Sequence, residues 1–530
     1  MKRILQLALA ISAVFHGEQL LAQADTLAMK YAETITPAEL KEHLYILASD
    51  AYKGRDTGSE EMRMAADYLI QQYKNMGVGP CNNGSYKQEY PLKKVKIGSS
   101  TISVGKGTYT FKKDYYSFGG FDQVDLSNLK IVFAGYGIET DKYNDYNGVD
   151  VKDAIVLCFM GEPVDASGNS IFTGNNTMSE WSDDFRMKRD LAAKKGAKAI
   201  LYIEPNFDYI LQRVAYFLDE PRMALDYPKG KNSEEEVLPY FFISPSMGDA
   251  IMKAGKQKGV EAIKKKINAK KSPKSSVLKV KGSIKLVSEK QSIQAENVLC
   301  FIEGSDLALK KEVVVVSAHF DHVGEMNGKI YNGADDDGSG TVTALEIAEA
   351  FQTAKKDGNG PKRSVLVLHV SGEEKGLLGS EWYSEYPIFP LESTVCDLNI
   401  DMIGRVDDQH KDNEKYVYVI GSDKLSTSLH SISEASNKTY TQLELDYTYN
   451  DPNDPNRFYY RSDHYNFAKH NIPVIFYFSG VHEDYHQPGD DPEKIMYEKM
   501  STIGHLIFHT AWEVANRAER LVVDVKSDFE

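Results

Sequence analysis

Cysteine is scarce in this sequence: Cys81, Cys158, Cys300 and Cys396 are the four in 530 residues, and none belongs to a C-x-x-C pair. This excludes a disulfide-rich scaffold, and the spacing assigns no disulfide. Cys158 and Cys300 lie in apolar, strand-like segments, which favours positions in a core. An excess of basic charge is also missing, because the net charge is -15. Nucleic acid is therefore not an expected partner, since phosphate binding requires a basic surface.

Long apolar runs are absent as well. A membrane-spanning helix takes about 20 apolar residues, and no stretch of that length follows the N-terminal region. At the N-terminus, Lys2 and Arg3 precede an apolar stretch at residues 4–15, and Ala-Gln-Ala at 22–24 matches an A-x-A cleavage site. The pattern predicts a signal peptide over residues 1–24. We therefore expect an exported protein, periplasmic or secreted, with no membrane span in the mature chain.

The composition is that of a globular protein, with 42% hydrophobic and 26% charged residues. The length predicts two or three domains. Thr36 followed by Pro37 marks a helix start, and Ser59 caps a second helix. Strand-like runs at 129–137, 154–157 and 199–203 and a helical pattern at 186–195 predict a compact mixed unit. A lysine-rich stretch around 264–274 is typical of a linker or a solvated helix face.

From Asn297 onward, apolar strand-like runs alternate with helical patterns. The run of four valines that begins at Val313 predicts a strand buried on both faces. Further strands are expected at 365–370, up to Asp401, and at 473–478, with a helix at 341–351. This alternation predicts an α/β fold with a mostly parallel central sheet flanked by helices. The ends of such strands are where open α/β sheets place their sites.

Side chains that can bind metal stand at these strand ends. His319 follows the Val313 run, and Asp321 is two positions further, where an extended chain would point it the same way. Its carboxylate could then orient the imidazole as a metal ligand. A glycine-rich turn at 333–340 contains Asp335, Asp336 and Asp337, whose mutual repulsion favours a bound cation or open solvent. The turn is too short for an EF-hand.

Two more strand ends carry carboxylates. Glu373 and Glu374 follow the strand at 365–370, and adjacent side chains point in different directions. One can therefore bind metal while the other reaches the water at that metal. Asp401 lies inside an apolar segment, where an unpaired carboxylate is costly to desolvate. His486 follows the last strand, and His464 and His482 compete with it as the remaining histidine ligand.

Together these motifs resemble metallopeptidase family twenty-eight, the co-catalytic two-zinc aminopeptidases. The resemblance covers roughly residues 295–515, and residues 47–55 resemble the family's N-terminal segment. Residues 125–260 resemble the protease-associated domain inserted in some members. The implied layout is an N-terminal part of the peptidase domain at 25–125, the inserted domain at 126–265, a linker at 266–294 and the catalytic domain at 295–530.

The resemblance also implies roles for single residues. One Zn²⁺ would be held by His319 and Asp401, a second by Glu374 and His486, with Asp336 bridging them, Glu373 as general base and Tyr485 stabilising the oxyanion. Two cations about 3.5 to 4 Å apart can share a hydroxide that attacks the scissile carbonyl. Glu373 would take the water's proton and return a proton to the leaving amine. The expected activity is removal of N-terminal residues from peptides.

Several alternatives remain open at this stage. One is carboxypeptidase or dipeptide-releasing activity on the same scaffold. Carboxypeptidase action would favour an arginine or a lysine aimed at a terminal carboxylate, and Arg405 and Arg461 lie near the motifs. A single-zinc glutaminyl cyclase is disfavoured by the full two-metal ligand set. A non-catalytic binding protein with structural metals would make Glu373 dispensable. Cobalt or manganese would also suit the ligands, and the sequence specifies neither the preferred substrate side chain nor the oligomeric state.

Overall fold

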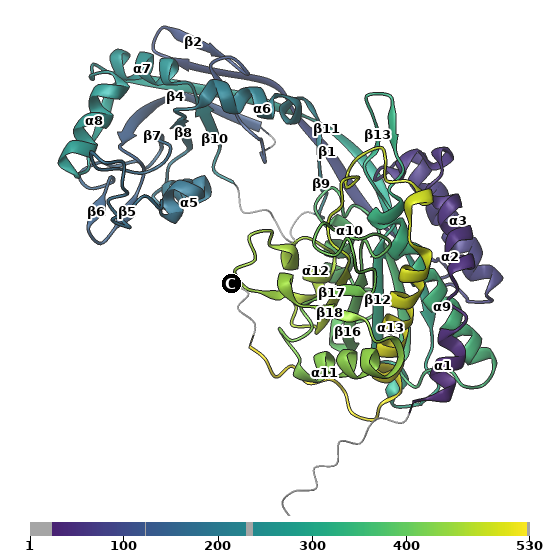
Figure 1. Ribbon diagram of the computed structural model, residues 1–530. Coiled ribbons are helices and arrows are strands. Elements are labelled where there is room, and N and C mark those ends of the chain that lie inside the picture. The colour runs from purple at the N-terminus through teal and green to yellow at the C-terminus, as the bar shows by residue number, and fades with distance from the viewer. Residues whose placement is uncertain (1–23, 122, 229–236, 527–530) are drawn as a thin grey trace, which may run out of the picture. The chain divides into compact units, whose positions relative to one another are not determined.

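The computed structural model describes residues 24–121, 123–228 and 237–526 (Figure 1). The chain divides into two compact units: unit 1 is Met1–Pro91 with Gln294–Glu530, and unit 2 is Leu92–Ile293. Nearly all of the predicted signal peptide lies outside the described residues. None of the described helices combines the length and apolar character that crossing a membrane requires.

Unit 1 is built on a central sheet whose middle strands are parallel, which confirms the predicted fold class. Apolar residues fill both faces of these strands, as expected for strands covered by helices on each side. The two antiparallel pairs lie outside these middle strands, β11 with β15 and β17 with β19, and the outermost pair of β17 with β18 is parallel. The order is β18 (Glu444–Asp446), β17 (Tyr416–Ile420), β19 (Val474–Phe478), β16 (Thr394–Ile400), β12 (Val313–His319), β15 (Ser364–Val370) and the end of β11 (Ser275–Ile302).

Helices flank this sheet on both sides (Figure 1). One apolar cluster joins β12 to Tyr383 and Phe467 of two short helices, and two long helices pack against β12 as well. The short helices are α10 (Leu378–Glu385) and α12 (His464–Ala468), the long ones are α9 (Gly340–Lys356) and α13 (Tyr497–Asn516), and α11 (Thr427–Ser436) lies against α13.

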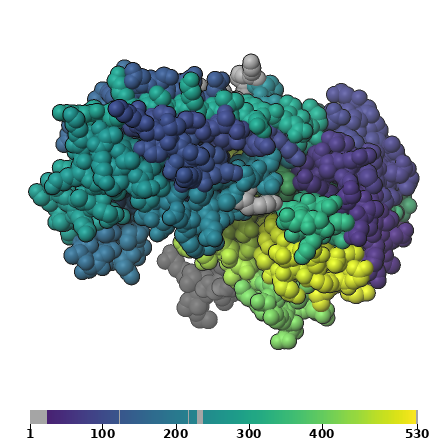
Figure 2. All heavy atoms as spheres, turned by 90° about the horizontal axis from the view of Figure 1, so that it is seen from above, coloured from purple at the N-terminus to yellow at the C-terminus, as the bar shows by residue number. Residues whose placement is uncertain are grey.

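The N-terminal helices belong to unit 1. They are α1 (Thr26–Ala32), α2 (Pro37–Leu47) and α3 (Glu60–Asn75). Thr36 and Ser59 cap α2 and α3 by accepting a hydrogen bond from a backbone N–H, as predicted. The purple N-terminal segment lies beside the yellow C-terminal helix in Figures 1 and 2. The Trp512 indole N–H donates to the Asp25 carboxylate at 3.0 Å, which ties the two ends of the chain together.

Unit 2 has its own parallel sheet, with the strands predicted at 154–157 and 199–203. Aromatic and aliphatic side chains cover both faces of this sheet and form its core. The neighbouring strands are β4 (Gln123–Ala134), β7 (Ala154–Phe159), β8 (Ala199–Ile203) and β10 (Tyr240–Ile243), and α5 (Phe185–Lys194), α7 (Pro245–Ala254) and α8 (Val260–Lys270) are among its helices.

The boundaries of unit 2 differ from the predicted ones. Unit 2 begins at Leu92 rather than near 126, because β1 (Lys87–Val104) is one long strand that continues into it. Most of the predicted linker at 266–294 belongs to β11, whose first half pairs antiparallel with β4. The lysine-rich stretch at 264–274, expected to be a linker or a solvated helix face, lies mostly in α8 and ends before β11. In β11, exposed positions alternate with buried residues such as Ile284 and Leu286. All four cysteines are free, and Cys81 is the one that is not fully buried.

Candidate metal centre and active site

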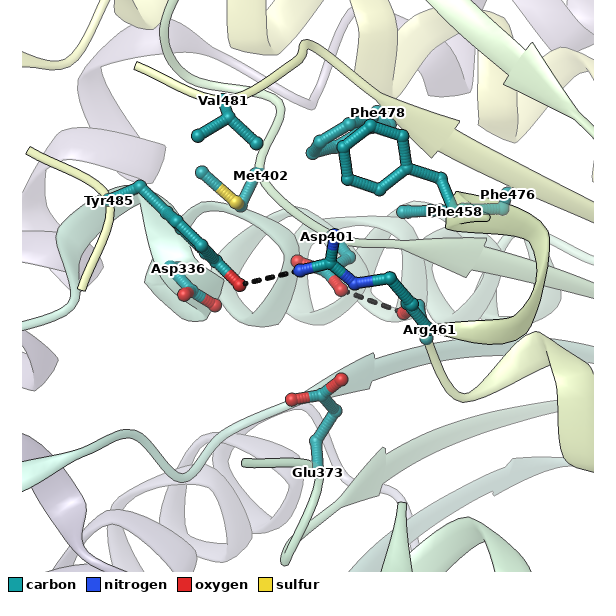
Figure 3. A pocket seen from close by; sticks show the side chains of 11 residues that line it. Asp336, Glu373, Asp401, Met402, Phe458, Arg461, Phe476, Phe478, Val481 and Tyr485 are labelled. Carbon is teal, nitrogen blue, oxygen red and sulfur yellow. Dashed lines mark hydrogen bonds between the residues drawn. The ribbon is translucent and has the colours of Figure 1, made fainter. Parts of the chain in front are cut away.

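The predicted ligands gather at the carboxyl ends of the parallel strands of unit 1. His319 ends β12, Asp401 follows β16, and Glu373 and Glu374 follow β15. Asp336 comes from the tight turn before α9. Figure 3 shows Asp336, Glu373 and Asp401 facing one pocket from different elements, so segments far apart in sequence build a single site.

Asp336 lies between two histidines and presents one oxygen to each. His319 Nε2 lies 3.3 Å from Asp336 Oδ1 and 3.7 Å from Asp401 Oδ1. On the other side, His486 Nε2 lies 3.0 Å from Asp336 Oδ2 and 3.1 Å from Glu374 Oε2. The five residues predicted as ligands therefore meet in two groups that share Asp336. Their role as ligands remains a prediction.

The neighbouring aspartates of the turn have other partners. Asp335 accepts a hydrogen bond from the Gly404 N–H at 2.6 Å, and its second oxygen lies 3.2 Å from His482 Nε2. Asp337 accepts hydrogen bonds from the backbone N–H groups of Met402 and His319 at 3.1 and 3.2 Å. Both carboxylates thus hold the surrounding loops in place. Asp336 is the member of the three that faces the pocket.

Several buried polar atoms of this site make no hydrogen bond. They are His319 Nε2, both ring nitrogens of His322, Asp336 Oδ2 and Glu374 Oε1. Leaving such an atom unsatisfied costs about 1–3 kcal/mol. Two sets of ligand atoms lie within 4.8 Å of one another, His319–Asp336–Asp401 and His322–Asp336–Glu374. Imidazole nitrogens and carboxylate oxygens are zinc ligands, so the residues present fit a bound divalent cation such as zinc.

His322 was missed in the sequence. It is fully buried, and its Nδ1 lies 2.7 Å from Glu374 Oε1 and 3.8 Å from Asp336 Oδ2. It thus approaches Glu374 as closely as His486 does, whose side chain is 38% exposed. The signal was its place three positions after His319, in the sequence H-x-D-H. Its position beside Asp336 and Glu374 suits a further metal ligand.

The other competing histidines lie elsewhere. His482 is engaged with Asp335, and buried His464 stacks on Phe476 with the ring centroids 4.8 Å apart. Neither approaches both Asp336 and Glu374 among the described contacts. Of the three histidines considered in the sequence, His486 is therefore the one that lies beside Asp336, the carboxylate shared by the two groups.

Protonation in the site follows from burial and the clustering of charge. Burial opposes the charge of His486, but contacts with Asp336 and Glu374 raise its pKa to about 10. Burial would also raise the pKa of Asp336, yet His319 and His486 hold it well below its usual range. The pKa of Glu373 is raised by burial and by the nearby carboxylates of Glu374 and Asp401, against the opposing effect of His319. Glu373 Oε2 lies 3.9 Å from His319 Nε2.

The contact predicted between Asp321 and His319 takes a different form. His319 Nδ1 lies 3.1 Å from the backbone carbonyl oxygen of Asp321 and 3.8 Å from its carboxylate. The chain leaves the extended conformation after β12 ends at His319, so the carbonyl meets the ring instead. The Asp321 carboxylate accepts from the Thr57 hydroxyl at 2.5 Å and from the Glu373 N–H at 3.4 Å. It therefore steadies the backbone of Glu373.

Arg55 is a second residue whose role the sequence did not reveal. It is fully buried, and each of its hydrogen bonds goes to a backbone carbonyl. It donates to Phe320 at 2.8 Å, next to His319, and to Asn332 and Gly333 at 2.8 and 2.9 Å, just before the aspartate turn. A further bond reaches Leu47 at the end of α2 at 2.7 Å. One guanidinium thus connects the N-terminal helices to two of the loops that carry proposed ligands.

The pocket itself has an acidic floor and apolar walls. The walls are formed by Met402, Phe458, Phe476, Phe478 and Val481. Tyr485, predicted to stabilise an oxyanion, lines the same pocket, and burial raises its pKa well above the usual range. The Ser462 hydroxyl donates to Asp401 Oδ2 at 2.7 Å.

The two arginines considered in the sequence differ in position. Arg461 lines the pocket and donates to the Tyr485 hydroxyl at 3.4 Å (Figure 3). Arg405 is paired with Asp484 at 3.2 Å and lies outside the pocket lining. Arg461 is therefore the one of the two that can meet a substrate.

The fold and the site define a class of protein. Histidines and carboxylates at the ends of parallel strands, with a further glutamate beside them, are the parts of a metallopeptidase. Residues 297–511 match the profile of Peptidase family M28. The family named from the sequence motifs is thereby confirmed.

Relatives agree with this assignment. A probable leucine aminopeptidase from Arthroderma otae is 30% identical over 212 residues, which is 39% of this chain and 55% of the relative. A probable glutamate carboxypeptidase from Arthroderma benhamiae is 36% identical over 107 residues, or 20% of this chain and 14% of the relative. The chain thus spans about half the length of the curated relatives it first matches, 55% in each of three leucine aminopeptidases.

The fold has a counterpart among solved structures. The aminopeptidase from Aneurinibacillus sp. strain AM-1 superposes with a TM-score of 0.53 at 18% identity, covering 94% of this chain and 99% of that one. At this identity the likeness establishes the fold alone. Activity has to be argued from the residues of this chain.

Proposed function

We propose that this protein is an exported two-zinc exopeptidase that removes N-terminal residues from peptides. The observation that carries the proposal is Asp336, whose two oxygens lie 3.3 Å from His319 and 3.0 Å from His486. One zinc would be held by His319, Asp336 and Asp401, and the other by Asp336, Glu374 and His486. When bound, the zinc ions supply Lewis-acid chemistry that polarises a carbonyl and lowers the pKa of water.

The chain's own residues supply the remaining chemistry. Glu373 is half-buried at the pocket and carries its carboxylate near His319, where it can take a proton from the attacking water. The same carboxyl group then returns a proton to the leaving amine. Asp321 keeps Glu373 in place through its backbone N–H. The Tyr485 hydroxyl can donate a hydrogen bond to the carbonyl oxygen as negative charge develops there.

The pocket favours a free amine near the reacting bond. Of the carboxylates that line the pocket, Glu373 is the one that is not a proposed zinc ligand. Its charge is therefore not offset by a bound cation, and it can attract a protonated N-terminal amine. This supports aminopeptidase action, in line with what the leucine aminopeptidase relatives are named for.

Carboxypeptidase or dipeptide-releasing action is the second candidate, and Arg461 is the observation that favours it. Its guanidinium lines the pocket and offers a fork that matches a carboxylate. A relative is named a probable glutamate carboxypeptidase. A binding protein with structural metals is the third reading, and it requires Glu373 to be dispensable.

Export and the identity of unit 2 belong to the same proposal. Export is supported by the basic and apolar pattern of residues 1–24. We propose that unit 2 is a protease-associated domain that controls access of substrates. A chain in which Leu92–Ile293 is replaced by a short linker would change the size range of accepted peptides if this is correct.

The test compares the zinc-loaded wild type with Glu373→Gln on a mixed set of peptides whose ends are free or blocked. Mass spectrometry follows the products. We expect stepwise loss from free N-termini by the wild type, slowed by about 10²- to 10⁴-fold in Glu373→Gln. Zinc content should stay unchanged, because Glu373 is not a proposed ligand.

Glu498→Gln on the exposed surface of α13 serves as the matched control and should retain wild-type rates. Loss from C-termini would transfer the assignment to carboxypeptidase. Equal rates in the wild type and Glu373→Gln, or no cleavage of any peptide, would contradict the proposed mechanism.

A further inference from the structure

Arg461 holds an unusual position in the pocket. It follows the short helical turn Phe458–Tyr460 and directly precedes Ser462, which holds Asp401. Of the side chains that line the pocket, Arg461 is the only cation, opposite the carboxylates of Asp336, Glu373 and Asp401. Figure 3 shows its guanidinium reaching toward the Tyr485 hydroxyl across the pocket.

The guanidinium lacks a carboxylate partner among the described residues. Its contacts are the Tyr485 hydroxyl at 3.4 Å and the Phe458 ring, with 4.9 Å from guanidinium carbon to ring centroid. No carboxylate oxygen of the described residues lies within 4.0 Å of a guanidinium nitrogen of Arg461. By contrast, Arg405 pairs with Asp484 and Arg363 with Glu312. An arginine placed this way has donors available for a carboxylate that arrives with the substrate.

The surroundings specify what kind of carboxylate fits. Phe458, Phe476 and Phe478 form an apolar wall that can cover the methylene groups of a side chain. Arg461 stands beside Tyr485 and donates one N–H to its hydroxyl oxygen, which leaves the other N–H groups of the guanidinium available to a carboxylate and the Tyr485 O–H available to the scissile carbonyl. A side chain with a short apolar stem and an acidic end matches this arrangement, and glutamate is the natural residue of that description.

We propose that Arg461, held beside Tyr485, forms a carboxylate-binding rim that makes acidic N-terminal residues, glutamate above all, preferred substrates. This rests on the proposed function, since it assigns specificity to the same site. The chemistry recognised is a carboxylate, and the chain terminus of a dipeptide is a second source of it. The experiment distinguishes the two sources by amidation of the C-terminus.

The experiment uses one peptide series that begins with Glu, Gln or Leu, each with a free or amidated C-terminus. kcat/KM is measured for the zinc-loaded wild type, Arg461→Met and Arg461→Lys. We expect the wild type to prefer Glu over Gln by about ten- to hundredfold, as a charge-assisted hydrogen-bond pair provides. Arg461→Met should abolish this preference, so that peptides beginning with Glu and with Gln are cleaved at equal rates. Arg461→Lys should restore part of it.

Arg457→Met is the matched control. Arg457 belongs to the same segment and lies over the Tyr460 ring at 4.8 Å, but it does not line this pocket. It should leave the Glu preference intact. If Arg461 raises kcat/KM only for peptides with a free C-terminus, whatever their first residue, it recognises the carboxylate of the chain end. That result would overturn the proposed preference for N-terminal glutamate.

Binding separates this inference from the proposed function. Calorimetry of the Glu and Gln peptides with zinc-loaded Glu373→Gln needs no turnover. Tighter binding of the Glu peptide than of the Gln peptide, lost when Arg461→Met is added, would support the rim. This holds even if the wild type cleaves no peptide, a result that would contradict the proposed function alone. Glu373-dependent cleavage of Leu peptides with equal treatment of Glu and Gln would overturn the rim and leave the proposed function standing.

Discussion

The two units differ in whether their buried ionisable side chains have hydrogen-bond partners. In unit 2, Asp145 accepts hydrogen bonds from the N–H groups of Tyr136 and Ile138 at 2.9 and 3.2 Å and from the Tyr143 hydroxyl at 3.0 Å. Lys188 donates to the carbonyl oxygens of Phe159 and Gly161. In unit 1, buried polar atoms without a hydrogen-bond partner occur in His319, His322, Asp336 and Glu374.

The contrast teaches where a ligand is needed. Hydrogen-bonded buried groups such as Asp145 fix the fold around them. A lone unpartnered atom is a weaker signal, since His464 and Asp397 of unit 1 also have one and lie away from the pocket lining. What distinguishes the metal centre is that several unpartnered atoms of opposite chemistry converge within 4.8 Å. That convergence is costly without a cation and is explained by one.

The largest effect is expected from exchanging the shared carboxylate. Asp336→Asn should remove most of the bound zinc and lower kcat/KM by more than the roughly 10- to 100-fold typical of residues that only support a ligand. Asp145→Asn in unit 2 should keep the full zinc content and lower the stability of the fold instead. Elemental analysis after dialysis and thermal unfolding measure both quantities. Zinc content equal to the wild type in Asp336→Asn would break the comparison.

A second pair of variants compares two fully buried arginines. Arg55 donates to carbonyls beside the ligands, whereas Arg363 donates to carbonyls of Val514 and Arg517 at the end of α13. Arg55→Lys should weaken zinc binding by about 10- to 100-fold, because the loops lose their common anchor. Arg363→Lys should lower the free energy of unfolding by about 1–3 kcal/mol with zinc affinity unchanged.

Competition with a fluorescent zinc chelator measures the affinity, and urea unfolding of the metal-free protein measures stability. If Arg55→Lys and Arg363→Lys lose zinc affinity to the same extent, Arg55 acts through general stability and not through the position of the ligands.

The last prediction concerns the pH dependence of folding stability in unit 2. Burial outweighs the hydrogen bonds of Asp145 and raises its pKa from 3.8 to about 6. Between these values the folded protein holds a proton that the unfolded chain releases, so stability falls as pH rises from about 4 to 6. The loss is at most about 3 kcal/mol for a difference near two pKa units. Asp145→Asn cannot titrate and should lack this slope.

Urea unfolding of the metal-free wild type and Asp145→Asn at pH 4, 5, 6 and 7 gives the comparison. The stability of the variant relative to the wild type should increase with pH over this range. Parallel curves would show that the Asp145 carboxyl group does not carry the pH dependence assigned to it.

Local sequence signals predicted much of the fold. The caps at Thr36 and Ser59 and the apolar runs of β7, β8 and β12 were predicted because each depends on neighbouring residues alone. The first half of β11 was missed, because its lysines alternate with buried residues and its partner β4 lies far away in the sequence. Pairing between distant strands leaves little trace in either strand.

The site divides in the same manner. The motifs placed His319, Asp336, Glu374, Asp401 and His486 together because each stands at a strand end or in a tight turn. The positions of His322 and of the Asp321 carbonyl depend on how the chain bends after β12. The role of Arg55 depends on contacts with distant segments, such as its hydrogen bond to Phe320, 265 positions later in the sequence. Only the folded structure joins them.

Anomalous diffraction at the zinc edge from zinc-loaded crystals tests the central claim most directly. The account predicts two peaks on either side of Asp336, one touching His319 and Asp401 and the other touching Glu374 and His486. A peak held by His322 in place of His486 would correct the ligand set. No peak at Asp336, or a single peak that does not involve it, would contradict the account.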